Sequence, residues 1–264
     1  MNPVWSEEAG APDAPLVVLI HGTMDRSAGM LKLSRQLDDR MRVLRYDRRG
    51  YGRSAPHHGP FDMAEQVGDL VHLLGGRRAV LVGHSYGGNV ALATANQYPT
   101  LVAGVAMYET PLSWEPWWPG TTAGAAARAT EGTSQDAAER FMRRLIGDAR
   151  WENLPERTRD TRMAEGAAMV GELRDLQANR PWIGERIGCP LMVSYGSNGA
   201  QHHRDGMTHV HEMVAGSTMV ELAGCRHDAP MSHANLFATM IVVPLLSEVG
   251  GAWAEAISRP EQAP

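Results

Sequence analysis

The chain has 264 residues, of which 25 are Lys or Arg and 30 are Asp or Glu, so its formal net charge is −5 at pH 7. This length is sufficient for one large domain with a substantial core, with or without an insertion. Because the balance is mildly acidic and the chain has no long basic run, neither a nucleic acid nor an anionic membrane surface is expected as a partner.

The N-terminal residues, the apolar runs and the cysteines give an expectation for the cellular location. Its first eight residues, Met-Asn-Pro-Val-Trp-Ser-Glu-Glu, lack the basic start and the apolar centre of a signal peptide. No apolar run reaches the roughly 18 to 20 residues that cross a bilayer. Cys189 and Cys225 lie far apart in the sequence and are expected to be free thiols. We therefore expect a cytoplasmic protein; the sequence leaves its oligomeric state open, a homodimer included.

Apolar, β-branched runs alternate with amphipathic segments along most of the chain. Strands are expected at residues 16–20, 42–46, 79–82, 102–108, 191–195 and 218–222. Helices are expected at residues 27–37, from Asp62 onward, at 89–97 and at 207–214. This alternation predicts an α/β fold, with a mostly parallel central sheet and helices on both faces.

The pattern changes between residues 111 and 181, where the strand signals vanish. Arg and Glu recur there at helical spacing, many alanines occur, and the stretch holds Trp114, Trp117, Trp118 and Trp151. We expect a helical cap insertion over the carboxyl ends of the strands. The predicted domains are thus a core, residues 1–111 and 182–264, and a cap, residues 112–181.

A G-x-S-x-G pentapeptide, Gly-His-Ser-Tyr-Gly at residues 83–87, joins an expected strand to an expected helix. A serine on such a turn occupies a strained backbone position, and the flanking glycines let the chain turn sharply. The helix that follows directs its N–H groups and the positive end of its dipole toward charge that develops nearby. This arrangement suits a nucleophile at Ser85, whereas the alternative is a glycine-rich turn that happens to contain a serine.

Four segments in this order make the chain resemble the α/β-hydrolase fold family over most of its length. They are Leu-Ile-His-Gly-Thr at 19–23, Tyr-Asp-Arg-Arg-Gly-Tyr-Gly-Arg-Ser at 46–54, the pentapeptide at 83–87, and Gly-Cys-Arg-His at 224–227. The resemblance implies esterase-like serine hydrolase chemistry without a cofactor and without a metal. It makes Ser85 the nucleophile and His227, which follows the last core strand, the base that takes its proton.

The acidic third member of the triad departs from the commonest pattern of the family. Most members carry an aspartate three residues past the glycine that ends the strand here at 191–195, but residues 196–199 read Gly-Ser-Asn-Gly. A minority place the acid after the preceding strand, where this chain has Glu109. Both strand ends open on the same side of the sheet, so Glu109 is predicted to reach His227 and to fix its tautomer.

Two aspartates remain alternatives to Glu109 as the triad acid. Asp205 lies nine residues past Gly196, and Asp228 directly follows His227. A purely structural role for Glu109, binding loop backbone, is also open at this point.

By the same resemblance, two backbone N–H groups stabilise the negative charge of the tetrahedral intermediate. One belongs to Tyr86, the residue after the nucleophile, and the other to Thr23, with its neighbour Met24 as the substitute. Because backbone N–H groups stabilise the negative charge, the side chains at these positions can shape the pocket without taking part in catalysis.

Other polar groups are expected to be structural. His202, His203, His209 and His211 lack acidic or cysteine partners at tight spacing and are predicted to be solvated rather than metal ligands. Asp47, Arg48 and Arg49 are expected to fix their loop by hydrogen bonds, and His21 and His84 to orient loops. The glycines after the first strand do not form G-x-G-x-x-G, which argues against a dinucleotide-binding fold.

The sequence therefore predicts a cofactor-free serine hydrolase that cleaves a carboxylic ester, thioester or lactone through an acyl-enzyme on Ser85. The Trp- and Met-rich insertion favours a small, mostly apolar carbonyl substrate. Two alternatives stay open: a carbon–carbon bond hydrolase that uses the same residues, and a non-catalytic ligand-binding protein of the same fold. Haloalkane dehalogenation is disfavoured, because that chemistry uses an aspartate where Ser85 stands.

Overall fold

The computed structural model describes residues 4–129 and 131–258. A seven-stranded sheet forms its centre, in the order β1-β3-β2-β4-β5-β6-β7. The strands are β1 (Ser6–Ala9), β2 (Leu16–Ile20), β3 (Arg42–Tyr46), β4 (Ala79–His84), β5 (Val102–Tyr108), β6 (Leu191–Gly196) and β7 (Thr218–Leu222). β1 pairs antiparallel with β3 and every other pair is parallel, which confirms the predicted mostly parallel sheet. β1 itself was not expected from the sequence, because its four residues are mostly exposed and carry no apolar run.

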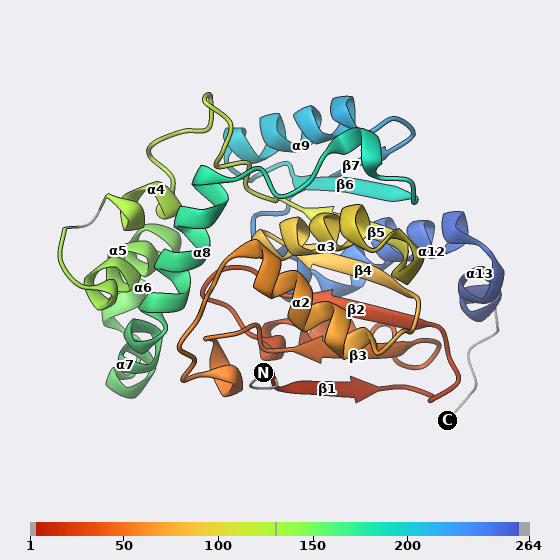
Figure 1. The fold of residues 1–264 in the computed structure, drawn as a ribbon, viewed down its shortest axis with the longest axis horizontal. Helices are drawn as coiled ribbons and strands as arrows, with labels where there is room; N and C mark the ends of the chain where they lie inside the picture. Colours follow the sequence, from red (N-terminus) through yellow and green to blue (C-terminus); the bar gives the residue numbers. More distant parts are fainter. Residues whose placement is uncertain (1–3, 130, 259–264) are drawn as a thin grey trace.

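Helices cover both faces of the sheet and also form a group at one end of it (Figure 1). The helices of the core are α1 (Leu31–Ser34), α2 (Met63–Leu74), α3 (Tyr86–Gln97), α9 (Gln201–Met213), α10 (Ala229–Ser232), α11 (Ala234–Phe237), α12 (Val243–Val249) and α13 (Gly251–Ser258). The helices of the end group are α4 (Ala123–Arg128), α5 (Ser134–Ile146), α6 (Asp148–Glu152), α7 (Glu156–Ala164) and α8 (Gly166–Ala178). Within residues 4–129 and 131–258, no helix has both the length and the apolar character that a membrane crossing requires.

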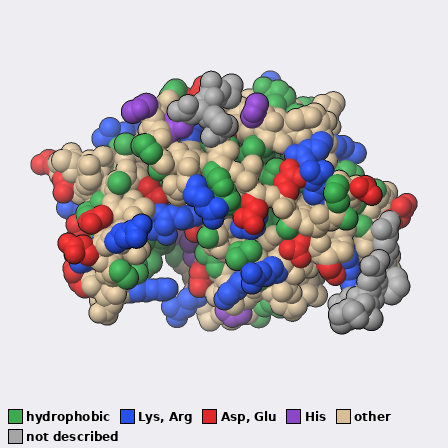
Figure 2. Space-filling model, turned by 90° about the horizontal axis from the view of Figure 1, so that it is seen from below, with side chains coloured by type: hydrophobic (Ala, Val, Ile, Leu, Met, Phe, Trp, Pro, Cys, Tyr) green, Lys and Arg blue, Asp and Glu red, His purple; other side chains and the backbone are tan. Residues whose placement is uncertain are grey.

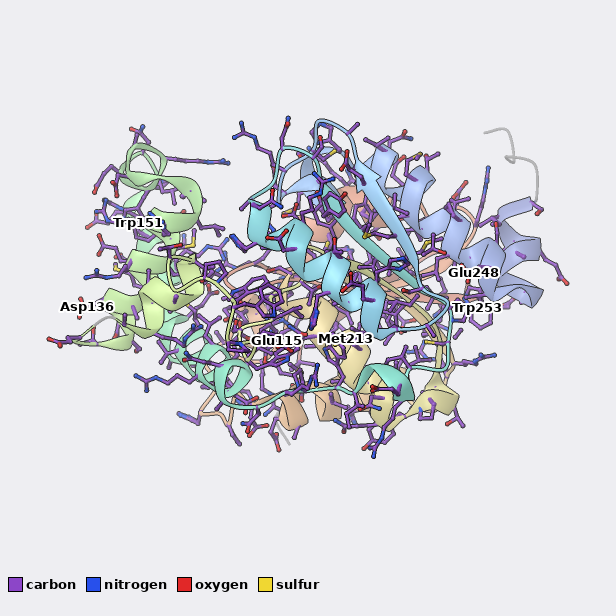
Figure 3. The ribbon with its side chains drawn as sticks, turned by 90° about the horizontal axis from the view of Figure 1, so that it is seen from above. Glu115, Asp136, Trp151, Met213, Glu248 and Trp253 are labelled. Carbon is purple, nitrogen blue, oxygen red and sulfur yellow. The ribbon has the colours of Figure 1, made fainter. Side chains whose placement is uncertain are left out.

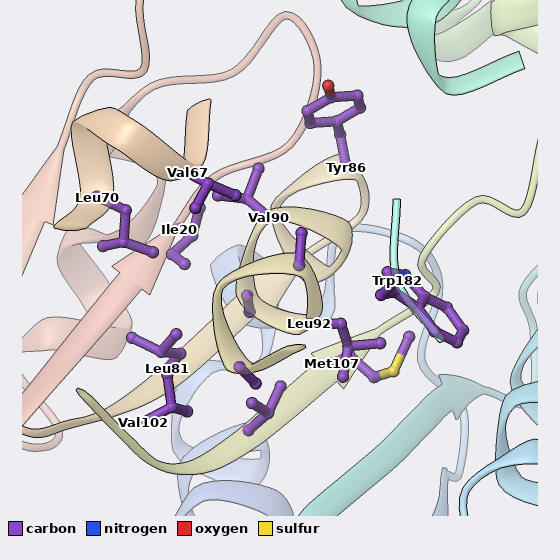
Figure 4. Close-up of a cluster of buried hydrophobic side chains, with 14 of the residues drawn as sticks. Ile20, Val67, Leu70, Leu81, Tyr86, Val90, Leu92, Val102, Met107 and Trp182 are labelled. Carbon is purple, nitrogen blue, oxygen red and sulfur yellow. The ribbon is translucent and has the colours of Figure 1, made fainter. Parts of the chain in front are cut away.

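The sheet is apolar on both faces, as a parallel sheet buried between helix layers requires. On one face, Leu81 and Met107 pack in a cluster with residues of α2, α3 and α9 (Figure 4). On the other face, Val80 and Ala106 pack under α1 and the C-terminal helices α11 to α13. Between these layers the carboxyl ends of β4, β5, β6 and β7 lie side by side, and the loops after them carry Ser85, Glu109, Gly199 and His227.

The end group of helices, α4 to α8, has an apolar cluster of its own. Its buried members include Phe141, Trp151 and Met169, and Trp151 lies far from Trp253 at the opposite end of the molecule (Figure 3). Two residues of core loops, Met24 and Tyr51, belong to the same cluster, so the cluster continues from the helical group into the loops beside Ser85. Viewed from below, the surface is hollowed between this group and the sheet, with basic side chains around the hollow (Figure 2).

Candidate active site

Ser85 occupies the sharp turn between β4 and α3. Its backbone has φ 53° and ψ −126°, a conformation that residues with a side chain rarely adopt. A Cβ atom on Gly83 would lie 2.4 Å from the carbonyl oxygen of Gly87, and one on Gly87 would lie 2.2 Å from that of Ile20. Close packing of the turn therefore requires a glycine at both positions of the pentapeptide. Ser85 itself is partly exposed, whereas its neighbours in the turn are buried.

His227 lies in the loop between β7 and α10, and contacts to neighbouring strands fix this loop. The hydroxyl of Tyr108 donates a hydrogen bond of 2.8 Å to the carbonyl oxygen of Arg226. Nε2 of His84, the residue before Ser85, donates one of 2.7 Å to the carbonyl oxygen of His227. The rings of His84 and His227 lie 4.7 Å apart between centroids. The structure thus brings the loop of His227 against the turn that carries Ser85.

Glu109 follows β5 and its side chain is fully buried. Its Oε2 accepts a hydrogen bond of 2.7 Å from Nδ1 of His227, and its Oε1 accepts one of 3.0 Å from the backbone N–H of Gly196. Because an ionised carboxylate only accepts hydrogen bonds, Nδ1 of His227 carries the proton. In a neutral ring Nε2 is then the acceptor, which is the tautomer that a general base for a serine needs.

Gly199 explains how Glu109 fits at this place. A Cβ atom on Gly199 would lie 2.4 Å from Oε1 of Glu109, so the carboxylate fills the space that a side chain at position 199 would take. Position 199 is three residues past Gly196, where the commonest pattern of the family has its aspartate. The glycine there and the glutamate after β5 are therefore complementary.

The rival acids lie elsewhere. Asp205 is exposed on α9 and accepts a hydrogen bond of 2.7 Å from Gln201 on the same helix. Asp228 is exposed at the start of α10, where its carbonyl oxygen accepts a hydrogen bond from Ser232. Of the three candidate acids, Glu109 is the one whose carboxylate binds His227 Nδ1.

The two proposed oxyanion-hole residues flank Ser85. Tyr86 is the first residue of α3, where backbone N–H groups have no partner within the helix. The loop of Thr23 packs closely on the turn of Ser85, since a Cβ atom on Gly22 would lie 2.8 Å from Cβ of Ser85. Met24, next in this loop, has a positive φ of 58°.

A buried ion pair lies directly behind these two residues. Nη1 and Nη2 of Arg48 donate to the carboxylate of Glu172 on α8 at 2.6 and 3.2 Å, and both side chains are fully buried. Oε1 of Glu172 also accepts hydrogen bonds from the hydroxyls of Thr23, at 2.7 Å, and Tyr51, at 2.8 Å. The guanidinium of Arg48 lies 4.6 Å from the ring centre of Tyr86. The carboxylate of Glu172, from the helical group, therefore ties together the loops of Thr23, Arg48 and Tyr51.

Removing the charge of Glu172 is expected to destabilise the protein strongly. In Glu172→Gln the buried Arg48 loses its counter-charge, and breaking such a pair costs about 3 to 5 kcal/mol. Denaturant unfolding at pH 7 measures this cost, with Glu212→Gln on the exposed side of α9 as the control, for which a change below about 0.5 kcal/mol is expected. The double replacement Arg48→Met with Glu172→Met is expected to recover much of the loss; equal unfolding of the single variant and the wild type would contradict this account.

His203 corrects the expectation that the histidines near residue 200 are solvated. Its side chain is 15% exposed and its Nε2 lies 3.8 Å from Oε2 of Glu109. Its ring stacks on that of His227, with centroids 4.7 Å apart and planes 14° from parallel. The physical reason is that α9 begins at Gln201, earlier than expected, so His203 falls on the helix face that also buries Gly206 and Val210.

Burial keeps the histidines around the site neutral. The pKa of His84 is lowered to about 3, first by burial and then by His227. Burial also lowers the pKa of His203 well below its usual value. The pKa of His21 is lowered in the same way by burial and by Arg48, whose backbone N–H donates to its Nε2 at 2.9 Å. Positive charge at neutral pH is therefore disfavoured on the three rings that surround His227 and the Arg48 loop.

Sequence reasoning missed two residues that belong to this site, Glu172 and His203. Each had a signal in its helical period. Glu172 lies three residues after Met169 and four before Leu176, both fully buried, so it stands on the apolar side of α8. His203 lies four residues before Met207 and seven before Val210 in the same way. A charged or titratable residue on the buried side of a helix indicates a specific partner.

Comparison with known proteins identifies the family to which this fold belongs. A family model described as the α/β hydrolase family matches residues 17–239. The 2-(acetamidomethylene)succinate hydrolase of Mesorhizobium japonicum is 36% identical over 94 residues, which are 34% of this chain and 34% of that protein. A bifunctional esterase/perhydrolase of Acinetobacter calcoaceticus is 36% identical over 103 residues, 36% of each chain. Each match thus spans about a third of the relative's length.

Solved structures resemble the chain over nearly its whole length. The enol-lactonase of Burkholderia xenovorans LB400 has a TM-score of 0.74 at 24% identity, covering 93% of this chain and 96% of that one. A thermophilic esterase of Thermogutta terrifontis has a TM-score of 0.70 at 23% identity, covering 94% of each chain. At these identities the likeness establishes the fold. Together with the family model, which matches most of the chain, it shows that the protein belongs to the α/β hydrolase family.

Proposed function

We propose that the protein is a cofactor-free serine hydrolase that cleaves a carboxylic ester, thioester or lactone through an acyl-enzyme on Ser85. The observation that supports this most is the 2.7 Å hydrogen bond between His227 Nδ1 and the buried carboxylate of Glu109. It gives His227 the tautomer of a general base, in a loop packed against the strained turn of Ser85. A nucleophile after β4, an orienting acid after β5 and a base after β7 are the parts that acyl transfer requires.

In this mechanism Oγ of Ser85 attacks the carbonyl carbon while Nε2 of His227 takes the hydroxyl proton. Glu109 stabilises the imidazolium that forms, without itself taking a proton. When the tetrahedral intermediate collapses, the bond to the leaving oxygen or sulfur breaks and Nε2 returns the proton to it. Water, deprotonated by the same nitrogen, then releases the acid from Ser85.

The negative charge of each tetrahedral intermediate falls on the former carbonyl oxygen. The backbone N–H groups of Tyr86 and Thr23 are assigned to stabilise it, and the loss of one such donor typically costs about 2.7 to 4 kcal/mol of barrier. The contacts of Glu172 with the Thr23 hydroxyl and with Arg48, which lies beside the Tyr86 ring, support a rigid placement of both donors. Rigid placement matters because donors set in advance need no reorganisation as the charge develops.

An uncharged, mostly apolar acyl group suits this site best. Met24 and Tyr51 from the loops next to Ser85 belong to the apolar cluster of the helical group. The nearby buried cation, Arg48, is already matched by Glu172 and does not offer its charge to an anionic substrate. We expect kcat/KM for p-nitrophenyl butyrate to exceed that for p-nitrophenyl hemisuccinate at least tenfold. Equal values for the two esters would contradict the apolar assignment.

Trapping the acyl-enzyme tests the proposal. The wild type and Ser85→Ala are mixed with excess p-nitrophenyl butyrate, quenched in acid within one turnover, and weighed intact. The wild type is expected to gain the mass of one butyryl group on the peptide that contains Ser85, and the variant none. An acyl group on another residue, or turnover that is unchanged in Ser85→Ala, would overturn the mechanism.

A further inference from the structure

Three potential metal ligands meet at the buried end of the proposed triad. Glu109, His203 and His227 each offer one ligand atom, and the three atoms lie within 4.8 Å of one another. Oε2 of Glu109 lies 2.7 Å from Nδ1 of His227 and 3.8 Å from Nε2 of His203. The second distance is too long for a hydrogen bond, so His203 approaches the carboxylate without binding it.

We propose that Glu109, His203 and His227 form a binding site for Zn²⁺ and that zinc bound there blocks the reaction at Ser85. The inhibitory half of this proposal rests on the proposed function, whereas the binding half does not. Two imidazoles and a carboxylate are ligands that zinc accepts readily, while Mg²⁺ and Ca²⁺ prefer sites made of oxygen atoms. Three protein ligands leave the fourth tetrahedral position to a water molecule.

The site can close by side-chain rotation. Zinc binds nitrogen at about 2.0 to 2.1 Å and oxygen at about 2.0 to 2.2 Å, which places tetrahedral ligand atoms about 3.4 Å apart. The contact of Glu109 with His227 has to open and that with His203 has to shorten, each by less than about 1 Å on this geometry. The rings of His203 and His227, now 14° from parallel, have to rotate so that both lone pairs face the ion, and their ligand nitrogens, now within 4.8 Å, have to lie about 3.4 Å apart.

The hydrogen bonding of His203 does not oppose this movement. Among the described residues, Nδ1 of His203 is buried without a hydrogen-bond partner, so no such bond holds the ring in its stack. His203 lies in the first turn of α9 and His227 in a loop, so both rings can turn about their side-chain torsions. Gly199, which has no side chain, leaves Oε1 of Glu109 free to keep its bond to the Gly196 N–H as Oε2 turns to the ion.

Zinc at this place prevents base catalysis through the tautomer of His227. A neutral imidazole carries one proton, and a metal on Nδ1 moves that proton to Nε2. Nε2 is the nitrogen that has to accept the proton of Ser85, so the metallated ring cannot serve as the base. The ion also takes Oε2 of Glu109, which removes the charge that would stabilise the imidazolium.

Direct zinc binding is measured on Ser85→Ala, so that the result does not depend on whether the protein turns over a substrate. Isothermal titration with ZnCl₂ in a non-chelating buffer is expected to show one equivalent bound, and MgCl₂ none. In the Ser85→Ala background, His203→Gln and His203→Phe are each expected to weaken zinc binding at least tenfold. The phenylalanine keeps an aromatic ring against His227 while removing the ligand. His209→Gln, a histidine of the same helix beside Glu115, is the control and is expected to bind zinc as before.

Inhibition is measured as the ratio of ester hydrolysis with and without zinc, taken separately for each variant so that basal rates do not enter. The wild type and His209→Gln are expected to lose hydrolysis as zinc is added and to regain it with EDTA, whereas both His203 variants need at least tenfold more zinc. One equivalent of zinc bound through His203, in a protein that hydrolyses no ester, would overturn the proposed function and leave the metal site standing. Zinc binding that is absent, or equal in the His203 variants, would overturn the metal site.

Discussion

Replacing Ser85 with Ala is expected to lower kcat for an ester by on the order of 10⁴- to 10⁶-fold. Alanine removes the nucleophilic oxygen while keeping a Cβ atom at the strained φ of 53°, so the turn itself is unchanged. Steady-state hydrolysis of p-nitrophenyl butyrate measures the loss. Ser232→Ala, at the exposed last residue of α10, is the matched control and is expected to retain wild-type turnover.

The residual rate carries its own information. Binding and oxyanion stabilisation survive the loss of the nucleophile, so Ser85→Ala is expected to stay above the rate in water. A variant that keeps more than about a tenth of the wild-type kcat would place the nucleophile at another residue.

Replacing Glu109 with Gln is expected to lower kcat about 10⁴-fold, which corresponds to about 5.5 kcal/mol of barrier. The amide can donate to Nδ1 of His227 and so favours the tautomer with its proton on Nε2, the wrong nitrogen for a base. It also carries no charge to stabilise the imidazolium. Asp205→Asn and Asp228→Asn are expected to remain near the wild type. Near-normal turnover in Glu109→Gln with loss in one of these aspartate variants would transfer the acid to that aspartate.

The complementarity of Glu109 and Gly199 offers a second test of the acid. Glu109→Ala empties the space beside position 199, and Gly199→Asp added to that variant can place a carboxylate there. The double variant is expected to regain at least tenfold over Glu109→Ala alone. Gly199→Asp by itself is expected to lose activity, because its Cβ would lie 2.4 Å from Oε1 of Glu109. If the double variant is no better than Glu109→Ala, the space at position 199 is not equivalent to that of the glutamate.

The fold followed from the sequence because its determinants are local. Runs such as residues 16–20 and 102–108 are continuously apolar and rich in β-branched or small residues, and both form fully buried parallel strands. The N-terminal capping residue of α2 was also predicted from the sequence. The side chain of Asp62 accepts a hydrogen bond from the backbone N–H of Glu65, as expected from their spacing. By contrast, β1 forms because it pairs with β3, and the sequence of its own four residues does not predict a strand.

Part of the site could be predicted from the sequence, because the residues concerned follow locally determined strands. Ser85, Glu109 and His227 stand directly after strands or in a turn, where the topology of a parallel sheet dictates that they converge. Glu172 and His203 come from helices whose rotation and depth are set by packing, so their partners are visible only once α8 and α9 are placed. The exposure expected for His203 was wrong because the start of α9 was placed six residues too late.

The central claim is that Ser85 is an activated nucleophile, and labelling with a fluorophosphonate followed by intact-mass spectrometry tests it most directly. The account predicts one adduct on the wild type, mapped to the peptide that contains Ser85, and none on Ser85→Ala. It also predicts much slower labelling of Glu109→Gln, since the reagent needs the same base. A folded wild-type protein that stays unlabelled, or an adduct that persists in Ser85→Ala, would contradict the account.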